Sequence, residues 1–295
     1  MINATTYEKF IQRYHINQKG GIRALWQRRN VLVGKLFQQL NINRIYNVPL
    51  FWGDYMNIVT NESTSNQIMN FGYTEVAITI FMLHYLQEGD TVIDVGTHFG
   101  YEAMLVAHLL GNKGKIICFE PNPSSYKLAE SNLKKIHSVK LYQAAVADKP
   151  GRMFIQNKDI SESAFNTITD KSDNDSVEVD VKTLDGLLNS YNKIDLIKCD
   201  VEGFEIEVIK GAANLLERDR PTLILEADMP SSEGYVSERA CKLAAHLKKY
   251  DYKPLIFDFK DKLQIGGFNT FPVFHANILF VHESNFDRLL PFYKT

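Results

Sequence analysis

From Glu75 onward, short apolar runs alternate with stretches of helical spacing, and this alternation constrains the fold more than any other feature of the sequence. It is typical of right-handed crossovers, which give a mostly parallel sheet with helices on both faces. The runs are TVIDVG from residue 91, KIICFEP from 115, VKLYQAAV from 139, DLIKCDVE from 195 and PTLILEAD from 221.

Two further runs, YKPLIFDF near 252 and HANILFVH near 275, follow a helix that we expect Ser237 to begin. No obvious helix separates these two runs, so one of them should be antiparallel to the rest. We therefore predict an α/β, Rossmann-like fold with a seven-stranded, mostly parallel sheet that contains one antiparallel strand.

Residues 1–70 have a different pattern, and we expect them to form a helical and hairpin extension to a main domain of residues 71–295. From Ile22 to Leu40, apolar residues recur at the spacing of an amphipathic helix. Such a helix needs a partner surface. We expect it to dock on the main domain or on a second copy of the chain, which would give a homo-oligomer.

Two shorter segments have recognisable signals. Residues 48–60 contain Pro49, Gly53 and an alternating Tyr55 and Ile58, which predicts a short hairpin. The stretch from about 157 to 176 is rich in Ser, Asn and Asp, and it predicts a mobile loop over the carboxyl edge of the sheet.

Charge is distributed unevenly, although the formal net charge is only -2. The first 50 residues are basic, with Glu8 as their one acidic residue, so the rest of the chain is acidic. We favour contact between the two parts; steering of an anionic acceptor and attraction to a lipid surface are the alternatives. An acidic main domain without a basic stripe argues against nucleic acid as a partner.

The sequence also suggests a compartment. The three cysteines are widely spaced, and Cys118 and Cys199 lie in apolar runs, which disfavours disulfides. The longest apolar stretch, from Val76 to Leu83, is far shorter than the roughly 20 residues that span a bilayer. The opening residues lack the basic start and apolar core of a secretion signal. We therefore expect a cytoplasmic protein with no transmembrane segment.

The first polar cluster is Asp94-Val-Gly96-Thr97-His98-Phe-Gly100, between a predicted strand and a helical run. Gly96 allows a sharp turn and close approach of a ligand, and Gly100 allows close helix packing. A dinucleotide fingerprint would have glycine at position 94, because pyrophosphate approaches backbone amides there. The carboxylate of Asp94 instead suits a ligand with a cationic end. S-adenosylmethionine has an ammonium and a sulfonium but no phosphate.

Glu120 ends the next predicted strand and should emerge at the same sheet edge. A carboxylate there can accept hydrogen bonds from both hydroxyls of a ribose, and it excludes a 2′-phosphate nearby. The alternative is structural, since an acid before the helix that follows Asn122 and Pro123 would stabilise that helix. We favour ribose binding.

The third cluster, Lys198-Cys-Asp200-Val-Glu202-Gly203-Phe-Glu205, follows the fourth predicted strand. Side chains alternate along a strand, so Asp200 and Glu202 should share one face. Repulsion among the three carboxylates should raise at least one pKa, as a general base for an alcohol requires. Alternatively, Glu202 and Glu205 stabilise a helix N-terminus and Lys198 pairs with one of these two glutamates. We predict catalytic roles for Asp200 and Glu202.

Together these motifs resemble the FkbM family of S-adenosylmethionine-dependent methyltransferases, over about residues 75–277. The features that carry the resemblance are Tyr73-x-Glu75, DVGTHFGYE, FEPNPSSYKLAESNL, AAVAD, VKTLDGLL, LIKCDVEGFEIEVIKGA and RPTLILE. The resemblance implies a class I methyltransferase sheet that binds S-adenosyl-L-methionine. The family is associated with O-methylation of sugars and natural products, which implies a hydroxyl on a small saccharide or natural product as acceptor.

The resemblance also implies roles for single residues. The methionine end of the cofactor would lie near Glu75, Asp94 and Gly96, its ribose on Glu120, its adenine beside Asn122 and Ala145, and Asp200 would face the reacting centre. Thr97, His98 and Gly100 belong to the same cofactor-binding loop. His98 stands where relatives commonly have asparagine, and it would either contact the cofactor by hydrogen bonding or act as an acid–base group.

Three other functions stay open. A nicotinamide-dependent dehydrogenase is disfavoured by Asp94. A non-catalytic module could keep the cofactor fold and use the basic N-terminal helix to bind a partner. The acceptor could also be the nitrogen of a small amine, which needs less help from a base.

Methyl transfer requires no metal, and we predict no metal site. The less favoured hypothesis is that strand-end residues hold Mg²⁺ against a diol; the candidates are Asp200, Glu202, Glu226, Asp228 and His275.

Overall fold

The computed structural model describes residues 4–19, 36–37, 39–40, 42–156, 168–169, 176–227, 237–259, 263–266 and 277–293. Most of the predicted helix of residues 22–40 and of the predicted loop of residues 157–176 lies outside the described residues, as do Asp228 and His275.

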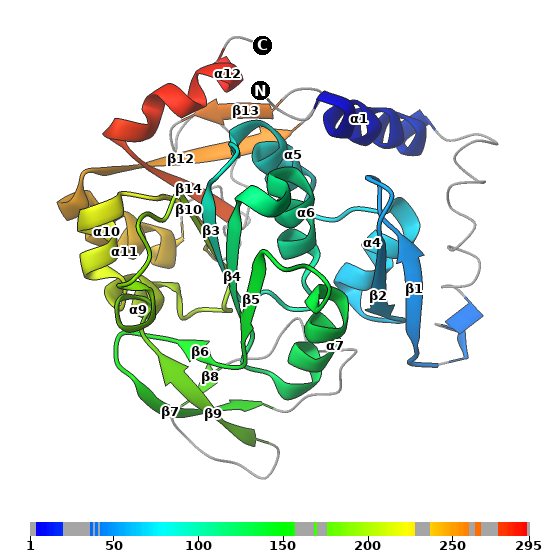
Figure 1. The fold of residues 1–295 in the computed structure, drawn as a ribbon, viewed down its shortest axis with the longest axis horizontal. Coiled ribbons are helices and arrows are strands. Elements are labelled where there is room, and N and C mark those ends of the chain that lie inside the picture. Colours follow the sequence, from blue (N-terminus) through cyan, green and yellow to red (C-terminus); the bar gives the residue numbers. More distant parts are fainter. Residues whose placement is uncertain are drawn as a thin grey trace.

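A central sheet has the strand order β13-β12-β14-β11-β10-β3-β4-β5 (Figure 1). Five neighbouring strands, from β11 to β5, are parallel, and β14 is antiparallel to both β11 and β12. Their bounds are β3 Thr91–Val95, β4 Lys115–Phe119, β5 Val139–Tyr142, β10 Leu196–Cys199, β11 Thr222–Glu226, β12 Tyr252–Phe259, β13 Leu263–Gly266 and β14 Asn277–His282.

The seven predicted strands and the antiparallel direction of one of them are therefore confirmed. The prediction lacked an eighth strand, β13, which pairs antiparallel with β12 at the edge of the sheet. The expected run Val139–Val146 is also divided, because β6 (Ala145–Val146) leaves the central sheet to pair with β9 in a second one. This sheet has the order β6-β9-β7-β8, with β7 Gly151–Gln156, β8 Ile168–Thr169 and β9 Ser176–Lys182.

Alternating side chains on the central strands bury apolar groups on both faces of the sheet. On β3, Val92 belongs to one hydrophobic cluster, whereas Ile93 and Val95 belong to another. Helices α5, α6 and α7 cover the first face, and α9, α10 and α11 lie on the other (Figure 1). Their bounds, with the short helix α8, are α5 Val76–Tyr85, α6 Tyr101–Leu110, α7 Pro123–Leu133, α8 Leu184–Leu188, α9 Glu205–Lys210, α10 Ala213–Asp219 and α11 Glu238–Leu247.

Helix ends follow the expected sequence signals. The Ser237 hydroxyl accepts a hydrogen bond from Ala240 N and caps α11, as predicted. Asn122 caps α7 in the same way through Ser124 N and Ser125 N, with Pro123 in the first turn. Single 3-10 turns follow α6 and α11, as η1 Gly111–Lys113 and η3 Lys248–Tyr250.

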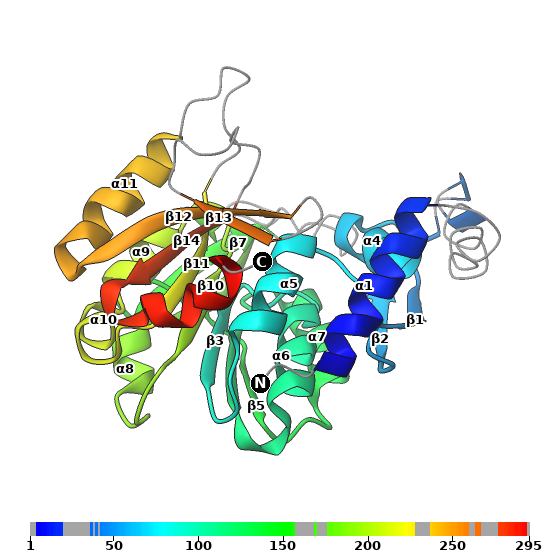
Figure 2. The same cartoon turned by 90° about the horizontal axis from the view of Figure 1, so that it is seen from above.

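The N-terminal extension packs against the first face of the main domain. It contains α1 (Ala4–Lys19), the hairpin β1 (Ile45–Pro49) with β2 (Tyr55–Val59), and α4 (Ser63–Phe71). The hairpin confirms the prediction for residues 48–60, although its first strand begins earlier. Figure 2 shows α1 running alongside α4 and α5. Phe10 of α1 and Phe81 of α5 belong to one hydrophobic cluster, so the extension and the main domain share a core.

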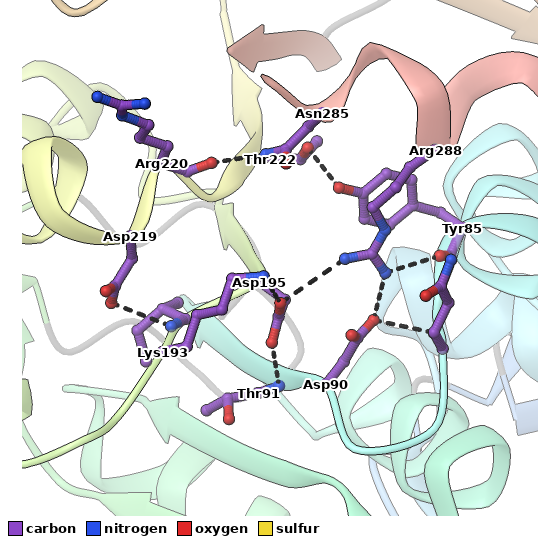
Figure 3. A network of polar contacts seen from close by, with 12 residues as sticks. Tyr85, Asp90, Thr91, Lys193, Asp195, Asp219, Arg220, Thr222, Asn285 and Arg288 are labelled. Atoms are coloured by element: carbon purple, nitrogen blue, oxygen red, sulfur yellow. Dashed lines mark hydrogen bonds and ion pairs between the residues drawn. The ribbon is translucent and has the colours of Figure 1, made fainter. Parts of the chain in front are cut away.

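The C-terminal segment, η4 (Glu283–Leu289) with α12 (Leu290–Tyr293), is fastened to the amino end of the central sheet (Figure 3). Arg288 Nη2 donates to Asp90 Oδ2 at 2.6 Å and to the Tyr85 carbonyl at 3.0 Å. Its Nη1 lies 3.7 Å from Asp195 Oδ1, and the other Asp195 oxygen accepts from Thr91 N. This network therefore joins η4, the loop before β3 and the start of β10.

All three cysteines are free. Cys118 and Cys199 are buried in β4 and β10, as their apolar surroundings predict, and Cys241 is exposed. Among the described residues, no helix combines the length and apolar character needed to cross a bilayer.

Candidate functional site

A pocket with a volume of about 260 Å³ lies at the carboxyl ends of β3, β4, β10 and β11. Ligand sites of open parallel sheets lie at this edge of the fold. Seven of the predicted site residues line the pocket: Glu75, Gly96, Thr97, His98, Glu120, Asp200 and Glu202. Asp94, Gly100, Asn122 and Ala145 are not among its lining residues, and all four are buried.

The turn after β3 has three residues in the left-handed region: Gly96 at φ 81°, His98 at φ 50° and Gly100 at φ 92°. A Cβ at Gly96 would collide with the Asp200 carbonyl. Gly96 is therefore needed for the close approach of the segment after β10, a role that the sequence analysis assigned to a ligand. At Gly100 a Cβ would press on the Leu133 side chain of α7, in agreement with the predicted close helix packing.

Asp94 is buried behind this turn. Its Oδ2 accepts a hydrogen bond from the Thr97 hydroxyl, and its Oδ1 lies 4.0 Å from Lys198 Nζ without a hydrogen-bond partner. Burial raises the pKa of Asp94 even though the Lys198 charge acts in the opposite direction. Asp94 thus holds the turn through Thr97, and its Oδ1 accepts no hydrogen bond from the described residues.

Glu120 bridges two backbone segments at the pocket wall. Its Oε2 accepts from His98 N and its Oε1 from Asn122 N, both at 2.9 Å. Each oxygen keeps a second lone pair for a ligand hydroxyl. Burial raises the pKa of Glu120 to about 8. The capping of α7, which was the structural alternative for Glu120, is performed by Asn122.

Lys198 of β10 is the centre of charge in the site, and its side chain is only 4% exposed. Its Nζ lies 3.3 Å from Asp200 Oδ2 and donates to it, whereas the alternative from the sequence paired Lys198 with Glu202 or Glu205. Burial disfavours the charged amine, but the charges of Asp200, Glu102 and Asp94 raise the pKa of Lys198 well above its usual value. Among the described residues that line the pocket, Lys198 is the single lysine or arginine.

Asp200, Glu202 and Glu226 converge at the ends of β10 and β11, with carboxyl oxygens within 4.8 Å of one another. Burial alone would raise the pKa of Asp200, but the Lys198 charge lowers it below its usual value. Burial and the charge of Asp200 raise the pKa of Glu226 to about 9. Crowding was expected to raise a pKa among Asp200, Glu202 and Glu205; in the structure the pKa of Asp200 is lowered and the raised pKa is that of Glu226, which the sequence suggested only as a metal ligand.

Glu205 does not join these carboxylates. Its Oε1 accepts from Val201 N and Gly203 N, and its Oε2 forms an ion pair of 2.6 Å with Arg239 of α11. The side chain is fully buried and fixes the turn into α9, so the structural alternative describes Glu205 correctly.

His98 is partly buried, and desolvation lowers the pKa of its imidazole to about 4, against the opposing charges of Glu62 and Asp200. A neutral ring at physiological pH favours hydrogen bonding over acid–base chemistry for this residue. Its catalytic role stays a prediction.

The N-terminal extension forms a wall of the pocket that the sequence analysis missed. Met56 of β2 and Ser63, Thr64 and Gln67 of α4 line it. The first turn of α4 is held by Glu62, whose carboxylate accepts from Thr64 N and Ser65 N. A polar N-terminal turn after an acidic cap is a local signal for the helix, but its contact with the pocket depends on tertiary packing.

Glu75 and Glu102 complete the acidic wall. Glu75 lies at φ 41° just before α5, and its Oε1 lies 3.5 Å from Asn277 Nδ2 of β14, which donates to it. Burial raises the pKa of Glu75, and it raises that of Glu102 to about 8. Glu102 was not predicted. It follows the cofactor turn in the first turn of α6, where a carboxylate near a helix N-terminus is common.

Comparison with known proteins identifies the domain. The model of the methyltransferase FkbM domain matches residues 94–254 of this chain, more than half of its length. The chain belongs to the FkbM methyltransferase family.

Curated relatives cover parts of the chain. The 2-O-methyltransferase NoeI of Sinorhizobium fredii is 27% identical over 173 residues, which are 52% of this chain and 71% of the relative. The hexuronic acid methyltransferase AglP of Haloferax volcanii is 26% identical over 46% of this chain and 55% of its own length. A protein-L-isoaspartate O-methyltransferase of Methanococcus aeolicus is 32% identical over 37% of this chain and 49% of its own length. This chain thus spans about half the length of AglP and of the isoaspartate methyltransferase.

A solved structure of a methyltransferase FkbM from Methylobacillus flagellatus is 14% identical, with a TM-score of 0.48, over 74% of this chain and 54% of its own.

The cofactor of this FkbM domain is S-adenosyl-L-methionine, and the described residues fit it. The pocket is rich in carboxylates and therefore suits a ligand with two cationic groups. Among the buried polar atoms that find no hydrogen-bond partner in the described part of the chain are Asp94 Oδ1 and Asn122 Nδ2. They lie at the two places where the resemblance implies the methionine end and the adenine, as an acceptor and a donor.

Proposed function

We propose that this chain transfers the methyl group of S-adenosylmethionine to a hydroxyl of a small acceptor, a saccharide or another natural product. One observation supports this most: the predicted cofactor residues Gly96 and Glu120 and the carboxylate of Asp200 line the same pocket. The name of NoeI, a 2-O-methyltransferase, supports an oxygen acceptor, and that of AglP, a hexuronic acid methyltransferase, supports a saccharide acceptor.

When bound, the cofactor supplies an electrophilic methyl group on a sulfonium. Positive charge disappears as the methyl group is displaced, so positioning rather than charge stabilisation should dominate the rate. In the proposal, Glu75 and Asp94 orient the cationic end, Glu120 accepts from the ribose hydroxyls, and Asn122 with Ala145 borders the adenine. Thr97 and Gly100 keep the turn in shape.

Asp200 is the proposed proton acceptor, with Glu202 beside it. The Lys198 charge keeps Asp200 ionised at neutral pH. An oxygen that has gained a methyl group while keeping its proton is a much stronger acid than a carboxylic acid. A carboxylate with a low pKa can therefore still receive that proton during or after attack.

Calorimetry with S-adenosylmethionine and S-adenosylhomocysteine tests the binding part. Asp94→Ala and Glu120→Ala should each weaken binding by about tenfold or more while the far-ultraviolet circular dichroism stays unchanged. Wild-type affinity in both variants would contradict the site assignment. A chain that bound neither ligand would favour the non-catalytic module, and tight binding of NAD would favour a dehydrogenase.

Incubation of the full chain with radiolabelled cofactor and panels of saccharides and amines tests the reaction. Asp200→Asn should lower turnover on a hydroxyl acceptor with little change in cofactor affinity. Transfer to amines alone, surviving replacement of both Asp200 and Glu202, would show that the acceptor is nitrogen.

A further inference from the structure

Glu226 lies next to Asp200 because of the register of β10 and β11. The last paired residues of these parallel strands are Cys199 and Leu225, so Asp200 and Glu226 follow them side by side. Both line the pocket, and their carboxyl oxygens lie within the 4.8 Å cluster that Glu202 shares. Two carboxylates this close cannot both ionise without strong repulsion.

The surroundings decide which of the two keeps the proton. The Lys198 charge lowers the pKa of Asp200, whereas burial and the charge of Asp200 raise the pKa of Glu226, so Glu226 is the partner that keeps the proton and can donate it to Asp200. Asp200 is also in contact with Lys198, whose Nζ is 3.3 Å from its Oδ2. Glu226 faces no comparable cation among the described residues, since it lies opposite the neutral Asn277 on β14. The other charges that act on it are those of Glu202 and Glu205, and Glu205 is paired with Arg239.

We propose that Glu226 is a positioning residue of the methyl-transfer site, which holds the Asp200 carboxylate, together with Lys198, in place to receive the proton of the acceptor. The inference rests on the proposed role of Asp200. As the new bond between oxygen and methyl carbon forms, the carbon–sulfur bond breaks and its electron pair stays on sulfur. The acceptor proton goes to Asp200, while Glu226 keeps its own proton and its hydrogen bond throughout.

The protonation of Glu226 can be measured without a methyl acceptor. In the full chain labelled with ¹³C at glutamate side-chain carboxyls, the resonance missing from Glu226→Gln identifies Glu226. Its titration midpoint should lie near pH 9. In Asp200→Asn the midpoint should fall by about one unit or more, because a neighbouring charge is lost. A wild-type midpoint near the usual glutamate value, or one that Asp200→Asn leaves unchanged, would overturn the inference.

Kinetics test the positioning role, on whichever acceptor the radiolabel screen identifies. Glu226→Gln keeps a hydrogen-bond donor toward Asp200, so its kcat should stay within about threefold of the wild type, whereas Glu226→Ala should lose about tenfold to a hundredfold. The exposed Glu217→Gln, which removes one carboxylate elsewhere, is the matched control and should change nothing. The wild-type rate should fall at alkaline pH as Glu226 ionises, and this fall should be absent in Glu226→Gln.

Two kinetic results would overturn the inference: equal losses in Glu226→Gln and Glu226→Ala, or wild-type rates in both. Asp200→Asn separates it from the proposed function. If Asp200→Asn keeps the wild-type kcat, the role of Asp200 is wrong and that of Glu226 falls with it. If Asp200→Asn is inactive while Glu226→Ala turns over normally, only the inference about Glu226 is overturned.

Discussion

Replacing Lys198 by methionine should destabilise the protein strongly at neutral pH. The ammonium is almost completely buried and lies 3.3 Å from Asp200 and 4.0 Å from Asp94. Methionine fills much of the same volume, so the main loss is the charge. Removing one partner from a buried ionic cluster leaves the other charges uncompensated, and this typically costs about 3–5 kcal/mol in the free energy of unfolding.

The loss of unfolding free energy in Lys198→Met should increase from acid to neutral pH. In the wild type the pKa of Asp200 is lowered, so its contribution to stability is present above the unfolded pKa and is lost as the pH falls through the folded one. Lys198 opposes the effect of burial on both carboxyls, so its removal should raise the pKa of Asp200 and raise that of Asp94 further. A group with a raised folded pKa contributes its full stability below the unfolded pKa, about 4, and loses it as the pH rises from there through the folded pKa. The difference between wild type and Lys198→Met should therefore be smallest below about pH 4 and largest at neutral pH.

Urea denaturation at acid and neutral pH measures this difference. Lys242→Met is the control, because Lys242 and its partner Glu238 form an exposed ion pair on α11 and its loss should be small at both pH values. The reasoning is refuted if Lys198→Met is as stable as the control, or if its loss of stability is the same at both pH values.

Three further changes test other parts of the molecule. Arg288→Met should lower the free energy of unfolding by about 2–4 kcal/mol, because the buried carboxylate of Asp90 loses its cation and keeps only the hydrogen bond from Gln87 N, while Asp195 keeps Lys193 (Figure 3); thermal melting with and without cofactor checks this, and an unchanged midpoint contradicts it. Gly96→Ala combines a collision with the Asp200 carbonyl and a positive φ, so it should abolish cofactor binding in calorimetry or prevent folding; normal affinity would show that the turn adapts. The imidazole resonances of His98 should not shift between about pH 6 and pH 8, since its pKa is about 4; a midpoint in that interval would restore it as an acid–base candidate.

The sequence predicts the central sheet well because its signal is local. Each strand of the parallel core is a short apolar run followed by a polar tip, and chirality places those tips at one edge. This is why Glu120 and Asp200, far apart in the sequence, could be assigned to one pocket. The strands of the second sheet are harder to predict. The first two of the six residues of β7, Gly151 and Arg152, are exposed, and the strand is stabilised by pairing with β9 rather than by its own composition.

The wall contributed by α4 could not be predicted for a similar reason. Ser63 and Thr64 look like an ordinary helix start, and nothing in their neighbourhood indicates that the helix packs beside the cofactor turn. Their position follows from the core that Phe10 and Met56 share with the main domain. Contacts between residues so far apart in the sequence leave no local pattern from which the position of α4 could be predicted.

The protonation state of a carboxyl group is the property that residue types predict least well. Asp200 and Glu226 end neighbouring strands and carry the same functional group, yet their pKa values move in opposite directions. The difference comes from Lys198, which faces Asp200 but not Glu226, and from the burial that makes a second negative charge costly. From the sequence alone, crowding was expected to raise a pKa among Asp200, Glu202 and Glu205, which lie on one segment, whereas the raised pKa is that of Glu226. Because the partner that keeps the proton is on an adjacent strand, the assignment needed the register of β10 against β11.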